Sequence, residues 1–422
     1  MKTVRLLFCT MICLSLLGAR LHAQQIESPR FQEETGLRDG NSLYVPSRFA
    51  ITSRGELENF ILVEMLQNRI PGLSASILKE GDVIWRGAFG HANFALNPPQ
   101  PVRADTLFMQ ASVSKTFTAV AIMQLWERGL FELDDPVNLY LPQFQVFSPH
   151  FPSEEITIRM LMTHTSGIDD NWDLMPIYQG DSPIPLGEYL ESYLAPWGAL
   201  YDPDLNFCTW KPGTDYEYTN IGISLVGHLV ETISKMEFDQ YCRKYIYKPL
   251  NLKETSFFVA KLIQAHIAMP YSWNGSDHVP YGHYGRSHFP AGQLRTSVPQ
   301  MERFLLTFMN KRGRTVPPHG PLTAAAVRQS DPRSLRLLES ATVELMLTQQ
   351  VPHINGSIGL IWNRVTAPDG VRLWGHIGGF YGVRTSMRYG PENDIGVILM
   401  TNGEGDKEEI FWAMYDYAVN YD

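Results

Sequence analysis

The sequence is poor in cysteine and has no motif typical of a metal site. It contains four cysteines in 422 residues, and two of these lie in the N-terminal apolar run, which leaves Cys208 and Cys242. CxxC, HExxH and closely spaced histidine pairs are absent, so no metal and no organic cofactor is expected. Two buried free thiols are the favoured interpretation, because free cysteine is among the most buried residue types. One disulfide formed in an oxidising compartment is the alternative.

Positive charge is also scarce. The 35 lysines and arginines are outnumbered by 44 acidic residues, which gives a formal net charge of −9, and no long basic run stands out. Nucleic-acid binding is therefore disfavoured, because neutralising phosphates requires clustered cations. The chain is 19% charged and 44% hydrophobic, a balance that excludes a disordered tail, a collagen-like fibre and a coiled coil.

Long apolar runs are missing everywhere except near the N-terminus. Lys2 and Arg5 precede an apolar run at residues 6–17, and the small residue Ala23 follows. The run is too short for a stable transmembrane helix and predicts a secretory signal at residues 1–23, with a retained anchor as the alternative. We expect a polar leader at residues 24–55, a single domain at 56–422, no membrane span after signal cleavage, and a secreted or periplasmic location.

The pattern of elements predicts an α+β fold. Residues 73–79 and 83–89 flank a Gly-containing turn and predict a β-hairpin. The last 50 residues or so contain three strand-like runs, at 372–376, 384–389 and 395–401, and then a helix at 408–419. Further helices are expected at 113–126, which carries no charged residue after Lys115, at 186–194, and just after Asn220, where apolar residues recur every fourth position. We therefore expect an antiparallel sheet built from N- and C-terminal strands and flanked by helices, with an inserted mainly helical region. Residues 168–211 and 271–290 are irregular and are expected to form binding walls.

Ser112 and Lys115 form the first candidate for chemistry. Three residues are about one helical turn, so the Lys115 amine falls on the face of the Ser112 hydroxyl at the start of this apolar helix. A lysine in an apolar setting loses its proton more readily, because burial disfavours the charged form. Ser-x-x-Lys alone is a weak signal, and a serine cap before an ordinary helix is the structural alternative. The GxSxG motif of α/β-hydrolases is absent.

Two later clusters strengthen this interpretation. Tyr218 and Asn220 lie at the start of this expected helix, which should be amphipathic; a phenol beside an amine can serve as a base there and an amide can hold a substrate. His376 is followed by Ile377 and two glycines, which let the backbone approach a ligand closely. The order Ser-x-x-Lys, Tyr-x-Asn, His-x-Gly is much less expected by chance than any one of the three.

With these motifs the chain resembles the serine β-lactamase-related hydrolases of the class C type, which have the β-lactamase/transpeptidase-like fold. That family also contains D-alanyl-D-alanine carboxypeptidases, D-amino-acid peptidases and esterases. The resemblance runs from about Arg69 to the C-terminus and is carried by several blocks in the family's order: IPG at 70–72, DTLF at 105–108, SVSK at 112–115, LDDP at 133–136, LMTHTSG at 161–167, YTN at 218–220, PAG at 290–292 and HIGG at 376–379.

The resemblance implies a role for each matching residue. Ser112 would be the acylated nucleophile, Lys115 its proton partner, and Tyr218 the general base and later acid. Asn220, His376 and Gly378 would lie along the substrate. The backbone N–H groups of Ser112 and Gly379 would form the oxyanion hole. The implied partners are small-molecule esters, amides or peptides.

The third motif departs from that of true class C β-lactamases. Where those enzymes carry Lys-Thr-Gly, this chain has His376, Ile377 and Gly378. A permanent cation and a hydroxyl are lost, so binding of an anionic β-lactam is expected to be weaker. An exported esterase or D-amino-acid peptidase is thus the first prediction. A genuine β-lactamase and a penicillin- or peptidoglycan-binding protein without turnover are the alternatives.

Several other polar residues are given structural roles. Ser114 points away from Ser112 around the helix and is the weaker nucleophile. His164 lies in a polar turn and is expected to satisfy hydrogen bonds there. His278, His283 and His288 match no metal spacing and are expected in the cleft or on the surface.

Overall fold

The computed structural model describes residues 51–309, 314–315 and 335–421. The expected signal peptide and nearly all of the expected leader lie outside these residues. Among the residues that the structure describes, no helix combines the length and apolarity needed to cross a bilayer.

A helix that we did not predict precedes the first strand. Helix α2 (Arg54–Gln67) begins with a capping box, in which Ser53 Oγ accepts from the Glu56 N–H at 3.3 Å and Glu56 Oε2 accepts from the Ser53 N–H at 2.9 Å. Leu57, Ile61 and Met65 form its buried stripe. The capping box and the apolar spacing are both visible in the sequence, so this helix could have been predicted.

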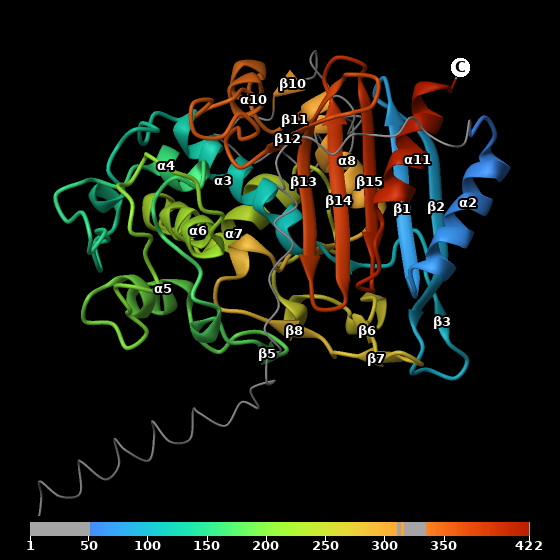
Figure 1. Cartoon of the computed structure of the whole chain (residues 1–422), viewed down its shortest axis with the longest axis horizontal. Helices are drawn as coiled ribbons and strands as arrows, with labels where there is room; N and C mark the ends of the chain where they lie inside the picture. The colour runs from blue at the N-terminus through green and yellow to red at the C-terminus, as the bar shows by residue number, and fades with distance from the viewer. Residues whose placement is uncertain (1–50, 310–313, 316–334, 422) are drawn as a thin grey trace, which may run out of the picture.

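The centre of the fold is a seven-stranded antiparallel sheet that joins the two ends of the domain (Figure 1). Strand β1 pairs with β15 in a register that sets Leu73 opposite Thr401, and it pairs with β2 on its other side. The predicted hairpin, C-terminal strands and α+β fold are therefore confirmed. The order of the strands across the sheet is β12 (Asn363–Thr366), β13 (Arg372–Phe380), β14 (Val383–Gly390), β15 (Ile395–Thr401), β1 (Gly72–Lys79), β2 (Asp82–Asn93) and β3 (Gln100–Pro101).

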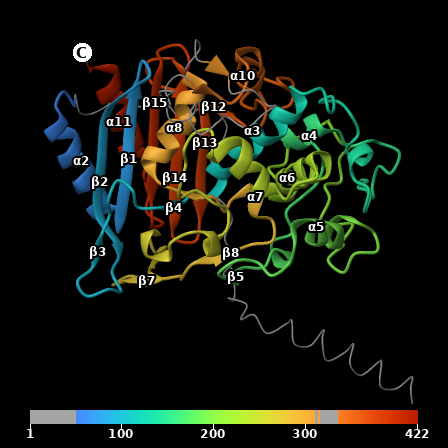
Figure 2. The ribbon, with the colours of Figure 1, turned by 180° about the vertical axis from the view of Figure 1, so that it is seen from behind.

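Helices cover both faces of the sheet. Helix α2 and helix α11 (Glu408–Val419) lie on one face, and helix α8 (Val298–Met309) lies on the other, as the two opposite views show (Figures 1 and 2). Because the central strands are covered on both sides, every residue of β15 is buried. This layer holds β13 rigidly beside the helical region.

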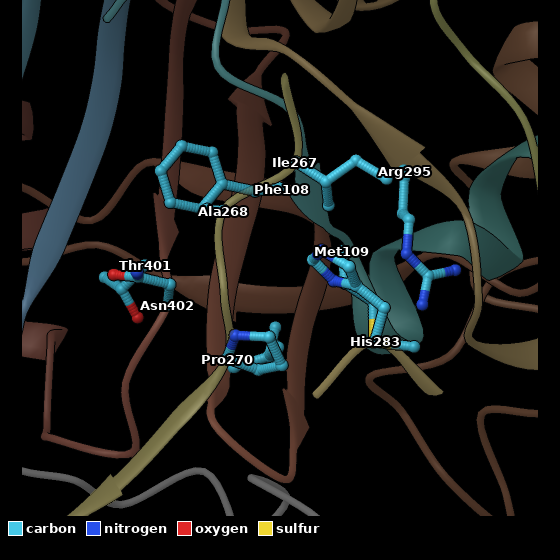
Figure 3. A pocket seen from close by; sticks show the side chains of 10 residues that line it. Phe108, Met109, Ile267, Ala268, Pro270, His283, Arg295, Thr401 and Asn402 are labelled. Atoms are coloured by element: carbon cyan, nitrogen blue, oxygen red, sulfur yellow. The ribbon is translucent and has the colours of Figure 1, made fainter. Parts of the chain in front are cut away.

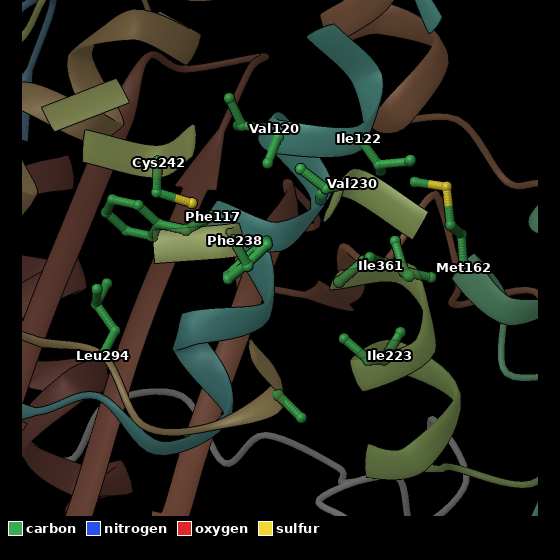
Figure 4. Packing of buried hydrophobic residues seen from close by; sticks show 14 of the residues in the cluster. Phe117, Val120, Ile122, Met162, Ile223, Val230, Phe238, Cys242, Leu294 and Ile361 are labelled. Carbon is green, nitrogen blue, oxygen red and sulfur yellow. The ribbon is translucent and has the colours of Figure 1, made fainter. Parts of the chain in front are cut away.

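The helical region lies on the β13 side of the sheet (Figure 1). It contains α3 (Lys115–Trp126), α4 (Ile158–Met162), α5 (Leu186–Leu194), α6 (Asn220–Ser234), α7 (Phe238–Cys242) and α10 (Ser340–Met346). Its core includes Phe117, Ile223 and Phe238 (Figure 4). Helix α3 is buried from Lys115 to Leu125, as the absence of charged residues after Lys115 predicted, and α5 has the predicted bounds.

Two details of these helices differ from the prediction. Ser112 lies in a 3₁₀ turn, Ala111–Ser114, and α3 proper begins only at Lys115. Helix α6 was expected to be amphipathic, but it is buried on nearly all sides because α3, α4, α5 and α7 pack around it. It therefore forms the centre of the helical region.

The remaining described strands form short two-stranded pairs. They pair β4 (Phe108–Met109) with β9 (Arg295–Thr296), β5 (Tyr178–Gln179) with β8 (Tyr284–Gly285), β6 (Tyr271–Trp273) with β7 (His278–Pro280), and β10 (Arg314–Thr315) with β11 (Leu335–Arg336).

Candidate active site

Ser112 lies where the chain leaves β4 and enters helix α3. Its side chain is buried, and the residue before it, Ala111, adopts a positive φ of 44°, which is unfavourable for a residue other than glycine. Gln110 anchors this bend: its N–H donates to the Leu294 carbonyl at 2.7 Å, and its own carbonyl accepts from Thr385 Oγ1 at 2.7 Å. The surrounding structure therefore holds Ser112 in a strained, well-defined position.

Lys115 is completely buried and contacts Ser112 directly. Its Nζ lies 2.9 Å from Ser112 Oγ, 2.6 Å from Asn220 Oδ1 and 2.7 Å from the Ala291 carbonyl oxygen. The amide and carbonyl oxygens only accept hydrogen bonds, whereas the serine hydroxyl can donate or accept. A neutral amine at this position can give its two N–H groups to the two oxygens and turn its lone pair toward Ser112. A protonated amine can donate to all three.

Tyr218 is the second predicted proton-handling residue, and it lies against Lys115. The Lys115 Nζ is 4.9 Å from the centre of the Tyr218 ring. The ring of His164 packs on the Tyr218 ring, with centroids 4.5 Å apart, and the His376 ring lies 6.2 Å away. The Lys115 amine therefore lies over the ring that carries the Tyr218 hydroxyl.

Asn220 is the first residue of helix α6. Thr219 caps this helix, because its Oγ1 accepts from the Gly222 N–H at 3.0 Å. The rigid, buried start of α6 thus carries the Asn220 amide to Lys115, which comes from a segment 105 residues earlier. The sequence shows only the order of the Ser-x-x-Lys and Tyr-x-Asn motifs. In the fold their side chains are in contact.

Strand β13 brings the third motif to the same place. His376 lies within this strand and not at its end as expected, because β13 continues to Phe380. A Cβ added to Gly378 would collide with the Gln110 carbonyl and Thr385 Oγ1, so only glycine lets β13 pack on the 3₁₀ turn. At Gly379 the nearest atom would be 3.7 Å away, on Arg384. Strand β12 pairs only with residues 372–375, so among the described strands none covers the outer edge of β13 beyond them.

The two histidines beside Tyr218 are held neutral. Burial and the nearby Lys115 charge lower the pKa of His376 to about 3 and place the pKa of His164 well below its ordinary value. His376 Nδ1 lies 2.5 Å from the Ile377 carbonyl and must be the protonated nitrogen, since a carbonyl only accepts. His164 Nδ1 instead accepts from the Thr219 N–H at 3.1 Å, so its proton is on Nε2. His164 thus has the hydrogen-bonding role that we predicted, within contact of the site.

Two groups that contact the site were not predicted from the sequence. One is the Ala291 carbonyl, which has no signature of its own, although the PAG block contains it. The other is Asp170, whose carboxylate accepts from the Asn220 amide at 2.8 Å. Asp170 lies in the irregular segment 168–211, where nothing in the sequence indicates that it meets a helix start 50 residues later.

The other polar candidates lie apart from the reacting groups. Ser114 Oγ accepts from the Leu294 N–H at 3.1 Å, a structural contact. His278 stacks on Phe94 with ring centroids 5.5 Å apart, and His288 is fully buried, so a surface position is wrong for His288. Cys208 and Cys242 are free thiols, and Cys208 is only half-buried, contrary to expectation.

Within residues 51–309, 314–315 and 335–421, no cluster of three or more His, Cys, Asp or Glu side chains could hold a metal ion. A cavity of about 10 Å³ beside β4 and β9, lined by Phe108, Arg295 and His283 among others, has room for roughly one water molecule (Figure 3). None of the predicted site residues lines it.

Comparison with known proteins identifies the family. A profile of the Beta-lactamase family matches residues 52–420. The chain belongs to the Beta-lactamase family. Members of this family are generally serine hydrolases, and the resemblance seen in the sequence is thereby confirmed at the level of family and fold.

Individual relatives are distant. Protein flp of Staphylococcus aureus (strain MW2) is 26% identical over 264 residues, which are 62% of this chain and 50% of flp, so the chain spans about half the length of this relative. The octameric penicillin-binding protein homologue from Pyrococcus abyssi superposes with a TM-score of 0.63 at 26% identity, over 86% of this chain and 76% of that one. The D-alanine carboxypeptidase AmpC from Burkholderia cenocepacia gives a TM-score of 0.61 at 23% identity, over 86% and 97%, a likeness of fold.

Proposed function

We propose that this chain is a serine hydrolase that forms an acyl-enzyme on Ser112 with an ester or D-amino-acid amide substrate. The observation that carries the proposal is the position of Lys115 Nζ, 2.9 Å from Ser112 Oγ and held by two further oxygens that can only accept. Activating a serine requires a base that is oriented toward its hydroxyl. Lys115 and the adjacent Tyr218 supply such a pair.

The proposed reaction has two halves. Ser112 Oγ attacks the substrate carbonyl carbon and gives its proton to the Lys115 and Tyr218 pair, while the N–H groups of Ser112 and Gly379 stabilise the developing oxyanion. Tyr218 then protonates the leaving alcohol or amine, and the carbonyl re-forms as an ester of Ser112. Water attacks this ester, loses its proton to the same pair, and releases the acid and free Ser112. Acid–base groups placed in this way contribute about 10²–10⁴-fold each.

The third motif determines our ranking of substrate classes. His376 is neutral because burial and Lys115 lower its pKa to about 3, and Ile377 offers no hydroxyl. A site with these two residues lacks both the charge and the donor that would favour an anionic β-lactam. We therefore rank esters and D-amino-acid amides above β-lactams as substrates.

A substrate panel tests this proposal. Short-chain p-nitrophenyl esters, a D-alanine p-nitroanilide and nitrocefin are given to the wild-type chain and to Ser112→Ala. We expect kcat/KM for the best ester or amide to exceed that for nitrocefin by at least about tenfold, a difference of about 1.4 kcal/mol. We also expect Ser112→Ala to be inactive. Faster nitrocefin turnover would favour a genuine β-lactamase, and a stable adduct without turnover would favour a penicillin- or peptidoglycan-binding protein.

We further propose that the chain is exported and acts in the periplasm or outside the cell, because residues 1–23 have the charge and apolar pattern of a secretory signal. Intact mass of the protein from cell fractions tests this. A species that begins at Gln24 in the exported fraction is expected, and a full-length species that stays with the membrane would support a retained anchor.

A further inference from the structure

Asp170 makes a concentrated set of hydrogen bonds with the start of helix α6. Its carboxylate accepts from Thr219 Oγ1 at 3.0 Å and from the Asn220 N–H at 2.8 and 2.9 Å to its two oxygens. It also accepts from the Ile221 N–H at 3.0 Å and from Asn220 Nδ2 at 2.8 Å. The first N–H groups of a helix lack partners inside the helix, so a carboxylate here is stabilised by them and stabilises them in return.

The contact with Asn220 Nδ2 differs from the rest, because it fixes the orientation of a side chain. An ionised carboxylate has no hydrogen to donate, so the NH₂ end of the amide must face Asp170. The oxygen end is then the one that faces Lys115, at 2.6 Å. Without this constraint the amide could turn by 180° and present its NH₂ group to Lys115.

The orientation of the amide bears directly on the proton of Ser112. With Oδ1 toward Lys115, a neutral amine gives one N–H to Asn220 and one to Ala291, and its lone pair is left for the serine hydroxyl. With Nδ2 toward Lys115, the amide would donate to that same lone pair and compete with Ser112, or would repel an ammonium group. The direction in which the Lys115 lone pair points therefore depends on the carboxylate that holds the Asn220 amide.

We propose that Asp170 is a positioning residue for the acylation of Ser112, which acts by locking the Asn220 amide with its oxygen toward Lys115. The inference rests on the proposed serine-hydrolase function. A bare helix cap would account for the bonds to the backbone N–H groups of Asn220 and Ile221, but not for the side-chain bond to Asn220 Nδ2.

The test compares two variants that both weaken the start of α6. Asp170→Asn keeps the shape of the side chain but can donate as well as accept, so it no longer dictates the amide orientation. Thr219→Ala removes the other cap, the bond from Gly222 N–H to Thr219 Oγ1, together with the bond from Thr219 Oγ1 to Asp170. It leaves in place the bond from Asn220 Nδ2 to Asp170, which is the one that orients the amide. Removing a cap typically costs about 1 kcal/mol of stability, so both variants should show lowered thermal midpoints.

Ester hydrolysis then separates positioning from capping. We expect Asp170→Asn to lower kcat by about 10–100-fold with KM changed by less than about threefold, because the amide orientation affects proton transfer more than substrate binding. Thr219→Ala should keep kcat within about twofold of wild type. If Asp170→Asn is unfolded at the assay temperature, Asp170→Ser replaces it in the same comparison. The serine hydroxyl can still accept from the helix N–H groups.

A double-mutant cycle provides the decisive measurement. The rate measured is the labelling of Ser112 by a fluorophosphonate. In an Asn220→Ala background there is no amide to orient, so adding Asp170→Asn should lower this rate by less than about twofold. Losses that multiply in the double variant, or equal effects of Asp170→Asn and Thr219→Ala on kcat, would overturn the positioning role. Failure of the proposed function itself would look different, because the wild type would then neither hydrolyse the ester nor become labelled.

Discussion

Lys115 Nζ and Asn220 Oδ1 lie 2.6 Å apart, although 105 residues separate them in the chain. This contact joins the first turn after β4 to the first turn of α6, and both elements are buried in the centre of the helical region. A buried amine so placed has its direction of hydrogen bonding set by its neighbours. The proposed chemistry of the site depends on that arrangement.

Replacing Lys115 tests its role in activating the serine. Lys115→Met keeps the apolar stem and removes the amine, and we expect kcat for ester hydrolysis to fall by about 10²–10⁴-fold. The variant should also lose about 1–3 kcal/mol of stability, since the Asn220 and Ala291 oxygens lose a buried donor. Kinetics and urea unfolding on the same preparation measure both effects.

Lys407→Met is the matched control for that experiment. Lys407 is likewise buried, but it pairs with Glu408 at the start of α11, on the sheet face that α2 and α11 cover. We expect Lys407→Met to lose stability with kcat per folded molecule unchanged. Equal losses of activity in the two variants would show that removing a buried lysine anywhere explains the result.

Tyr218→Phe removes one hydroxyl and keeps the ring that packs on His164. We expect kcat to fall by about 10²-fold or more, because the proton of Ser112 loses one of its two proposed acceptors. Tyr216→Phe serves as the comparison: its ring also contacts His164, at 5.9 Å between centroids, but it lies outside the proposed proton path. Stopped-flow acylation by a p-nitrophenyl ester measures the difference, and similar rates for wild type and Tyr218→Phe would remove Tyr218 from the mechanism.

Two neighbouring glycines of β13 should respond differently to the same substitution. In Gly378→Ala the new methyl group would press on the Gln110 carbonyl and Thr385 Oγ1, whereas Gly379→Ala has 3.7 Å of clearance. We expect Gly378→Ala to lose about 1–3 kcal/mol of stability and most activity, because the 3₁₀ turn that carries Ser112 must shift. Gly379→Ala should keep its thermal midpoint within about 1 °C, a shift of less than about 1 kcal/mol for a domain of this size.

The buried neutral His376 predicts a pH dependence of stability. Its pKa is about 3 in the folded chain and about 6.5 when unfolded, so between these pH values the unfolded chain binds more protons. Stability from this group is therefore fully present above about pH 6.5 and is lost as the pH falls toward 3, by at most about 1.4 kcal/mol per unit. His376→Gln should flatten the rise of unfolding free energy between pH 5 and 6.5, whereas the exposed His353→Gln should not. Identical slopes in all three proteins would contradict the prediction.

The sequence predicted the sheet and the central helices because their signals are local. Period-two strands around Gly81, the apolar helix between Lys115 and Glu127 and the four-residue spacing after Asn220 need no knowledge of distant contacts. Helix α2 was missed although Ser53 and Glu56 formed a capping box, an oversight and not a limit of the sequence. The burial of α6 on all sides could not be inferred, because it results from helices that come from four separate segments.

The candidate site was predicted unevenly for a related reason. Four site residues belong to motifs that can be recognised by their order in the chain, and the structure brings them together: Ser112, Lys115, Tyr218 and Asn220. Asp170 and the Ala291 carbonyl act through position alone. A carboxylate in an irregular segment and a backbone oxygen have no residue pattern, so only the folded chain shows that they surround Asn220 and Lys115.

The most direct test of the account is covalent labelling of Ser112. The purified chain, Ser112→Ala and Ser114→Ala are each treated with a fluorophosphonate, and intact mass and peptide mapping locate the adduct. We predict a single adduct on Ser112 in the wild type and in Ser114→Ala, and none in Ser112→Ala. An unlabelled wild type, or an adduct that persists in Ser112→Ala, would contradict the claim that Ser112 is the nucleophile.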